Sequence, residues 1–137
     1  MKIEYLEDSQ DGPLVRLFDF STTEVTEFKR LVDKLVRGKV PSVVLHEHCN
    51  INPRDNCHLT FVTSKENKGI QRKGEEFECA LTPSSLSSIS ELISSFAFHP
   101  AEGYEWLDET SNIALLISPH KSWQGAEENQ GAHTRLP

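Results

Sequence analysis

The stretch Phe20–Gly38, FSTTEVTEFKRLVDKLVRG, decides the fold because it contains the start, the apolar face and the end of one amphipathic helix. Ser21 and Glu24 have the spacing of a capping box, in which each side chain satisfies a backbone N–H of the other residue. Gly38 supplies a left-handed stop. The stretch therefore predicts a helix over Thr22–Arg37 that packs one face against a sheet. Its apolar stripe consists of Val25, Phe28, Leu31, Val32, Leu35 and Val36.

A second helix is predicted from Thr82 onward, with Thr82 as the N-cap and Pro83 at the first helical position. Serine fills most of its polar positions and is a mediocre helix former, so tertiary packing has to hold this helix. We expect it to end at His99-Pro100. The apolar stripe of this helix is Leu86, Ile89, Leu92, Ile93 and Phe96.

Short β-branched or alternating segments predict the strands. The clearest is His58–Thr63, in which Leu59 and Phe61 share one face. The segments 47–56 and 64–75 lack an apolar period and are predicted to be loops, the second one mobile. The predicted strands are Lys2–Glu7, Pro13–Phe20, Ser42–His46, His58–Thr63, Glu76–Leu81, Tyr104–Leu107 and Ile113–Ser118.

These elements follow the order β-β-α-β-β-β-α-β-β, which predicts an α+β fold. Strands joined by short loops pair antiparallel, so we expect a mainly antiparallel sheet with both amphipathic helices on one face. Residues 1–123 are expected to form one domain, and 124–137 a flexible C-terminal tail with almost no apolar content. The face of the sheet away from the helices then has to be solvated or covered by a partner.

Composition narrows the classes of function. The 137 residues include 14 Lys and Arg and 21 Asp and Glu, a formal charge of −7. An acidic surface repels phosphate backbones, so no nucleic-acid partner is expected, whereas a basic protein is a compatible partner. No apolar run approaches a membrane span or a signal peptide, so no membrane association is expected. The odd number of cysteines fits a reducing compartment, and we expect a cytoplasmic location.

Histidine and cysteine gather between positions 46 and 58. Imidazole nitrogen and thiolate sulfur are ligands that zinc prefers, so His46, His48, Cys49 and His58 are candidate metal ligands. A hydrolase-like zinc site is the alternative function that follows. The spacing matches no zinc module, however, and His46 with His58 fits a cross-strand pair equally well. In that interpretation Cys57 is a small core residue.

The last predicted hairpin carries two large aromatic residues with acidic neighbours. Tyr104 and Trp106 point to the same side of a strand, and Glu105 and Asp108 flank them. If that side is the open face of the sheet, the four residues form a candidate partner-binding patch. If it is the side that the helices cover, both aromatics belong to the core.

No phosphate-binding glycine loop, nucleophile elbow or zinc-protease motif occurs in the chain. The sequence therefore favours a small acidic binding protein over an enzyme, with no cofactor unless zinc binds. Its partner is expected to be another protein or a second copy of the chain. The uncovered sheet face and the last hairpin are the expected binding surface.

Overall fold

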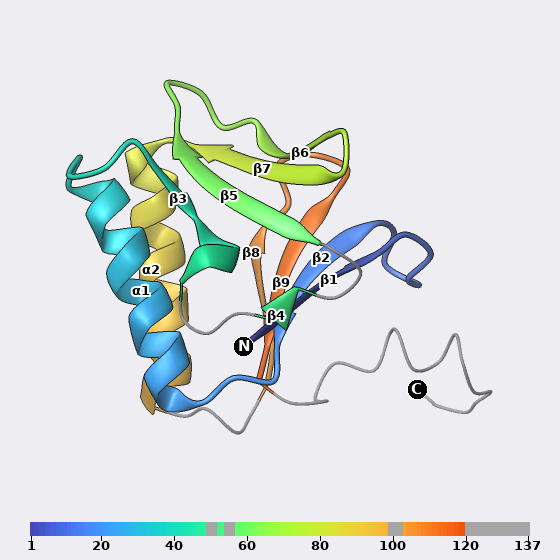
Figure 1. Ribbon diagram of the computed structural model, residues 1–137, viewed down its shortest axis with the longest axis horizontal. Coiled ribbons are helices and arrows are strands. Elements are labelled where there is room, and N and C mark those ends of the chain that lie inside the picture. The colour runs from blue at the N-terminus through green and yellow to red at the C-terminus, as the bar shows by residue number, and fades with distance from the viewer. Residues whose placement is uncertain (49–51, 54–56, 99–102, 120–137) are drawn as a thin grey trace.

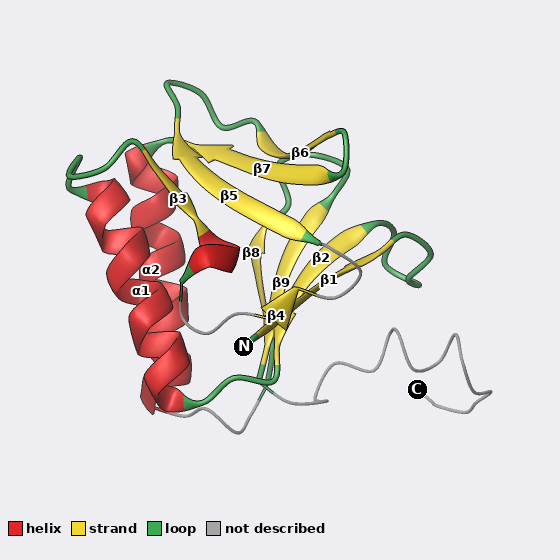
Figure 2. Cartoon of the chain, viewed as in Figure 1, coloured by secondary structure: helices red, strands yellow, loops and turns green. Residues whose placement is uncertain are grey.

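The computed structural model describes residues 1–48, 52–53, 57–98 and 103–119. In Figure 1 two α-helices lie side by side at one end of the protein and the strands extend away from them. Figure 2 shows the same division between helical and strand layers. The elements are β1 (Lys2–Leu6), β2 (Leu14–Phe18), α1 (Thr22–Val36), β3 (Ser42–Val44), a 3-10 turn (Leu45–Glu47), β4 (Asn52–Pro53), β5 (His58–Thr63), β6 (Gly69–Lys73), β7 (Glu76–Leu81), α2 (Pro83–Phe98), β8 (Glu105–Asp108) and β9 (Ala114–Ser118).

The strands form two mixed sheets. Sheet A has the order β4-β1-β2-β9-β8 and sheet B the order β3-β5-β7-β6. Three pairs are parallel, namely β1 with β4, β2 with β9 and β5 with β7, and the remaining four pairs are antiparallel. The predicted α+β class is confirmed. The domain boundary predicted at residue 123, and the tail predicted after it, lie outside the described residues.

The predicted single, mainly antiparallel sheet is corrected to two mixed sheets, and two strands lie in segments predicted to be loops. The predicted loop 64–75 contains β6, and the predicted loop 47–56 contains β4. β6 is an edge strand in which Gly69 and Ile70 are buried while its last three residues are exposed, so it has no apolar alternation. Because β6 pairs antiparallel with β7, the chain between β5 and β7 makes a crossover and those two strands run parallel.

Helix α1 is specified by its ends, as the sequence predicts. The Ser21 hydroxyl accepts a hydrogen bond from the Glu24 N–H, and the Glu24 carboxylate accepts one from the Ser21 N–H. At the other end Gly38 has φ +71°, and its N–H donates to the Leu35 carbonyl while Lys39 N–H donates to the Lys34 carbonyl. This pair of bonds is the Schellman stop. Capping of this kind is worth about 1 kcal/mol per helix end.

The main core lies between the helices and the facing sides of both sheets. Phe28 of α1 and Phe61 of β5 have ring centroids 5.8 Å apart. Tyr5 of β1 and Phe77 of β7 lie 4.9 Å apart and join the two sheets at the end away from the helices. Every residue predicted for the α1 stripe except Val36, which is partly buried, is fully or almost fully buried. One continuous apolar cluster thus holds the helices and both sheets together.

A polar contact also joins the two helices. The Ser90 hydroxyl of α2 donates to Asp33 of α1 at 2.5 Å, and the Lys29 ammonium lies 2.9 Å from the same carboxylate. Burial raises the pKa of Asp33, but the hydrogen bonds from Ser90 and Lys29 outweigh it and the pKa lies below its usual value. The stabilisation that the Asp33 carboxylate contributes is therefore fully present above the ordinary pKa of aspartate. It is lost as the pH falls through the lowered pKa of the folded state.

Gly69, at the start of β6, lies in close contact with the β8–β9 turn. Its φ is +74°, and an added Cβ would lie 2.8 Å from the Ser111 backbone nitrogen and 3.0 Å from both Asp108 Oδ2 and Thr110 Cβ. Gly74 has a similar φ of +67° but nothing within 4 Å of such a Cβ. Alanine substitutions at the two positions therefore distinguish the free-energy cost of a left-handed backbone from that of a steric clash.

Gly69→Ala is expected to lower the free energy of unfolding by about 3 kcal/mol, because it adds a clash with backbone to left-handed strain. The control Gly74→Ala should cost about 1 kcal/mol, since it adds strain alone. Urea denaturation of both variants measures the difference. Equal losses would mean that the contact between β6 and the β8–β9 turn is loose enough to open at no cost.

Two serines on sheet A and its turn make a second matched pair. The Ser111 hydroxyl lies 2.7 Å from the Ile70 carbonyl oxygen and accepts a hydrogen bond from the Ile113 N–H at 3.1 Å. Ser118 is fully buried, and its hydroxyl has no hydrogen-bond partner among the described residues.

Ser111→Ala should lower the free energy of unfolding by about 1–2 kcal/mol, whereas Ser118→Ala should leave it unchanged or raise it by up to about 1 kcal/mol. Denaturation midpoints of the two variants should move apart; a shift of both in the same direction would contradict this prediction.

Candidate functional site

The two sheets differ in the faces that they turn away from the main core. On sheet B the outward positions of β5, β6 and β7 carry mostly polar residues, among them Thr60, Gln71 and Glu78. On sheet A the outward positions of β2 and β9 carry Leu14 and Leu116, both fully buried in a second apolar cluster. A polar outward face is usual for an antiparallel or mixed sheet against solvent, so the apolar face of sheet A is the unusual one.

We call this second cluster, together with the neighbouring tyrosine, the Trp106 patch. Leu14 and Leu116 form its base, and partly buried side chains from β1, β8 and β9 pack around them. Trp106 lies opposite Leu116 in the β8–β9 pair, which fixes it on the outward face. The patch consists of Leu6, Leu14, Tyr104, Trp106, Ala114 and Leu116.

Tyr104 and Trp106 are thus surface residues of the patch and do not belong to the main core. Their rings meet edge to face with centroids 6.4 Å apart, a favourable arrangement for aromatic quadrupoles. Tyr104 is 44% exposed, the only large apolar side chain classed as exposed in the described part of the chain. Trp106 is partly buried, so the pair offers one anchored ring and one accessible ring.

The two acidic members of the predicted patch lie elsewhere. Glu105 is paired with Ile117, so it faces the main-core side of sheet A at its edge. After an irregularity in β8, Asp108 is paired with Leu115, whose side chain also belongs to the main core. Asp108 accepts hydrogen bonds from the N–H and the hydroxyl of Thr110, which shapes the turn. The structure therefore brings Tyr104 and Trp106 together and separates them from Glu105 and Asp108.

The same outward face holds an ion pair that the sequence analysis missed. Arg16 in β2 lies 2.6 Å from the Glu4 carboxylate in β1, and the side chains are 9% and 17% exposed. The Arg16 guanidinium also lies over the Phe18 ring, 4.1 Å from its centroid. The signal in the sequence was an arginine inside the otherwise apolar strand LVRLF. Such a charge is retained in a buried position only when it is paired.

The predicted metal ligands are only partly brought together. The rings of His46 and His58 stack with centroids 4.0 Å apart and planes 11° apart, so the two residues form a pair, but the pair does not join two strands. His46 lies in the 3-10 turn, not in a strand as predicted, and its buried Nδ1 has no hydrogen-bond partner among the described residues. His48 is exposed just after that turn, and Cys49 lies outside the described residues.

A stacked pair is poorly arranged to share one metal ion. Imidazole lone pairs lie in the ring planes, and a zinc ion needs them to converge about 2 Å from each nitrogen. Nearly parallel planes 4.0 Å apart direct the lone pairs side by side. No group of three or more His, Cys, Asp or Glu side chains with metal-binding geometry occurs within the described residues. Zinc binding by His46, His48, Cys49 and His58 therefore stays a prediction.

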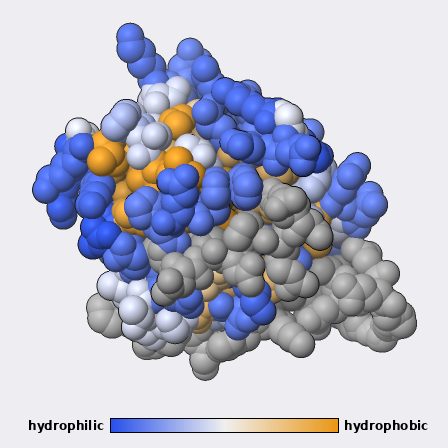
Figure 3. Space-filling view, in the orientation of Figure 1, coloured by the Kyte–Doolittle hydropathy of each residue, from blue (hydrophilic) through white to orange (hydrophobic). Residues whose placement is uncertain are grey.

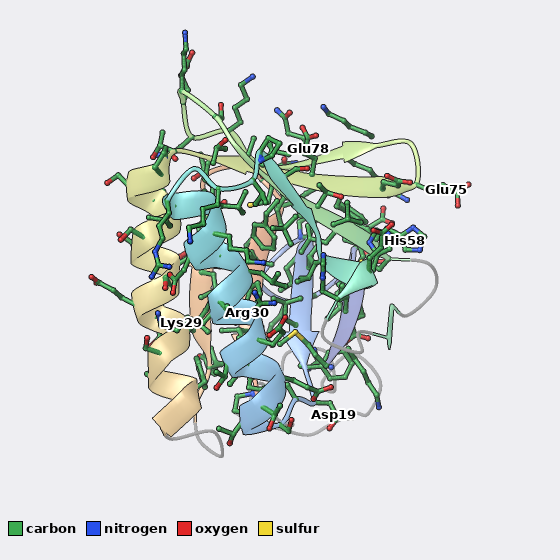
Figure 4. All side chains as sticks on the ribbon, turned by 60° about the vertical axis from the view of Figure 1, so that its left-hand side comes forward. Asp19, Lys29, Arg30, His58, Glu75 and Glu78 are labelled. Carbon is green, nitrogen blue, oxygen red and sulfur yellow. The ribbon has the colours of Figure 1, made fainter. Side chains whose placement is uncertain are left out.

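Two open pockets lie on sheet B. One, of about 470 Å³, is lined by His58, Lys73, Glu75 and Glu76; Figure 4 shows His58 and Glu75 on the side of the molecule away from the helices. The Lys73 ammonium also lies 2.8 Å from the Glu78 carboxylate and forms an ion pair with it. The other, of about 500 Å³, lies where α2 begins and is lined by Thr63, Ser64, Lys65, Thr82 and Pro83. In the described part of the chain, the Ser64 and Thr82 hydroxyls accept hydrogen bonds from the backbone N–H groups of Glu66 and Ser85.

The described cysteines are core residues. Cys57 and Cys79 are 3% and 0% exposed, which confirms the core interpretation of Cys57. Burial, with a smaller contribution from the charge of Asp108, raises the pKa of the Cys79 thiol well above its usual value. A thiol held in its neutral form is a poor nucleophile and a poor metal ligand.

Comparison with protein-family models, with curated proteins and with solved structures finds no match for this chain. None of the described helices is both long and apolar enough to cross a membrane. Figure 3 shows that the face seen in Figure 1 is mostly hydrophilic, with a limited apolar area toward the helices. Since no similar protein suggests a function, the functional proposal is based on the geometry of the Trp106 patch.

We expect the stacked histidines not to hold a structural metal ion. Adding a chelator should leave the thermal unfolding midpoint unchanged, and native mass spectrometry of protein purified without chelator should give the metal-free mass. A mass increase of one zinc ion that disappears in the His46→Ala/His58→Ala variant would contradict this expectation. It would then establish the zinc site predicted from the sequence.

Proposed function

We propose that this protein is a binding module that recognises another protein through the Trp106 patch on the outward face of sheet A. The observation that carries the proposal is the exposed Tyr104 ring beside Trp106 on a base of buried leucines. Binding energy in protein interfaces concentrates in aromatic anchors at a well-packed centre. A base that is already packed means that little side-chain entropy is lost on binding.

The exposed aromatic ring at the patch supports a binding function, and the nearly parallel rings of His46 and His58 do not support a zinc hydrolase. We further propose a reducing, cytoplasmic location, because the odd number of cysteines in the chain fits a reducing compartment. A second copy of the chain is the alternative occupant of the patch.

Selection of peptides from a random library displayed on phage tests the proposal. Peptides that bind the wild-type protein should lose at least about tenfold in affinity for Trp106→Ala, because an aromatic anchor is worth 2 kcal/mol or more in an interface. Tyr104→Ala should give a smaller loss without unfolding, since its ring is exposed. Lys68→Ala, an exposed change in the loop before β6, is the matched control and should bind as the wild type does.

Selected peptides that bind all four proteins equally would overturn the proposed site. Sedimentation equilibrium on the same samples separates the alternative occupant. A wild-type dimer that Trp106→Ala converts into a folded monomer would place a second copy on the patch and would contradict recognition of a different protein.

A further inference from the structure

We infer that the partner of the Trp106 patch presents a basic protein surface, with an apolar side chain for the aromatic pair and lysine or arginine around it. The inference rests on the proposed function and adds the chemistry of the partner. The net charge differs between the two sheets, and the exposed carboxylates of sheet A lie in turns beside the patch.

Nearly all of the net charge of the chain lies on sheet A and its turns. Residues 1–20 and 103–119, which contain its four long strands, carry eight carboxylates and only two cationic side chains, a balance of −6 against −7 for the whole chain. Sheet B is close to balanced, because residues 57–81 carry four cationic side chains and four carboxylates. The charge asymmetry therefore coincides with the sheet that carries the apolar patch.

The two cations of sheet A are already engaged. Arg16 is paired with Glu4 at 2.6 Å, and Lys2 is paired with Asp19 at 2.8 Å. Within residues 1–20 and 103–119, both cationic side chains are thus paired with carboxylates of the same sheet. The remaining carboxylates of residues 1–20 and 103–119 are Glu7, Asp8, Asp11, Glu105, Asp108 and Glu109.

Topology places the acidic turns together beside the patch. Because β2 and β9 run parallel with Leu14 opposite Ala114, the β1–β2 turn and the β8–β9 turn lie at the same end of sheet A. The Ala114 N–H donates to the Pro13 carbonyl at 3.2 Å, which ties the two turns to each other. Leu14 and Ala114, which begin these strands, are themselves members of the Trp106 patch.

The carboxylates of these turns are accessible. Glu7, Asp8 and Asp11 are exposed in the first turn, and Glu109 is exposed in the second. Exposed charges act over a screening length of about 8 Å at physiological salt, enough to reach a partner docked on the adjacent patch. An apolar centre with a rim of one sign is complementary to an apolar anchor ringed by the opposite sign. Nucleic acid and anionic membranes carry the wrong sign for this rim.

A pair of synthetic peptides that differ only in charge tests the inference. One alternates lysine with leucine and the other alternates glutamate with leucine, and each is titrated into ¹⁵N-labelled protein while amide shifts and affinity are recorded. The lysine peptide should shift the amides of residues 104–116 and bind at least about tenfold more tightly than the glutamate peptide at low salt. Its affinity should fall as salt is raised, because screening weakens exposed charge pairs.

Charge-neutralised variants locate the effect. Glu7→Gln/Asp11→Asn/Glu109→Gln should weaken binding of the lysine peptide about tenfold, since three exposed charge pairs are lost. The matched control Glu66→Gln/Glu75→Gln/Glu76→Gln removes three exposed carboxylates from sheet B and should leave the affinity unchanged within about twofold. All six positions are exposed, so both variants are expected to fold.

The outcomes separate the inference from the function on which it rests. Equal binding of both peptides at the patch, lost in Trp106→Ala, would overturn the basic partner and leave the binding site standing. Equal losses from the sheet A and sheet B neutralisations would also overturn the inference, because attraction would then be unspecific. Shifts confined to residues outside the patch, or no shifts with either peptide, would overturn both proposals.

Discussion

Burial of β2 on both of its faces is the constraint on which the rest of the structure depends. Val15 and Leu17 enter the main core, while Leu14, Arg16 and Phe18 face the other way and are buried as well. A strand buried on both sides needs neighbours on both edges to satisfy its backbone, and β1 and β9 provide them. The centre of sheet A thus places β2 between the first and the last described strands of the chain.

The same constraint explains how the two sheets are held in place. With β9 fixed beside β2, the β8–β9 turn reaches β6, where Gly69 allows a backbone approach that no side chain could share. Ser111 secures that approach through the Ile70 carbonyl. Tyr5 on Phe77, with the Arg72 guanidinium 5.2 Å from the Tyr5 ring centroid, closes the sheets at the far end. The helices cover the remaining side of the core.

The outward faces of the two sheets differ in composition. On sheet A this face combines leucines, an aromatic pair and a paired arginine, whereas the outward face of sheet B is polar. Folding alone does not require this difference, since sheet B is stable with the ordinary alternation. We propose recognition of a partner as the reason for this difference, and the acidic turns beside the face are the reason for proposing a basic partner.

Local patterns in the sequence determined both helices, the two capped ends of α1, the N-cap of α2 and the strands with regular alternation, because each depends on neighbours a few residues away. Tertiary structure alone decided that β2 pairs with β9, that β6 turns β5 and β7 into a parallel pair, and that His46 stacks on His58. It also decided that Trp106 faces outward while Glu105 and Asp108 do not. These outcomes depend on which strand lies beside which, and that is fixed by contacts between residues far apart in the chain that leave no trace in local periodicity.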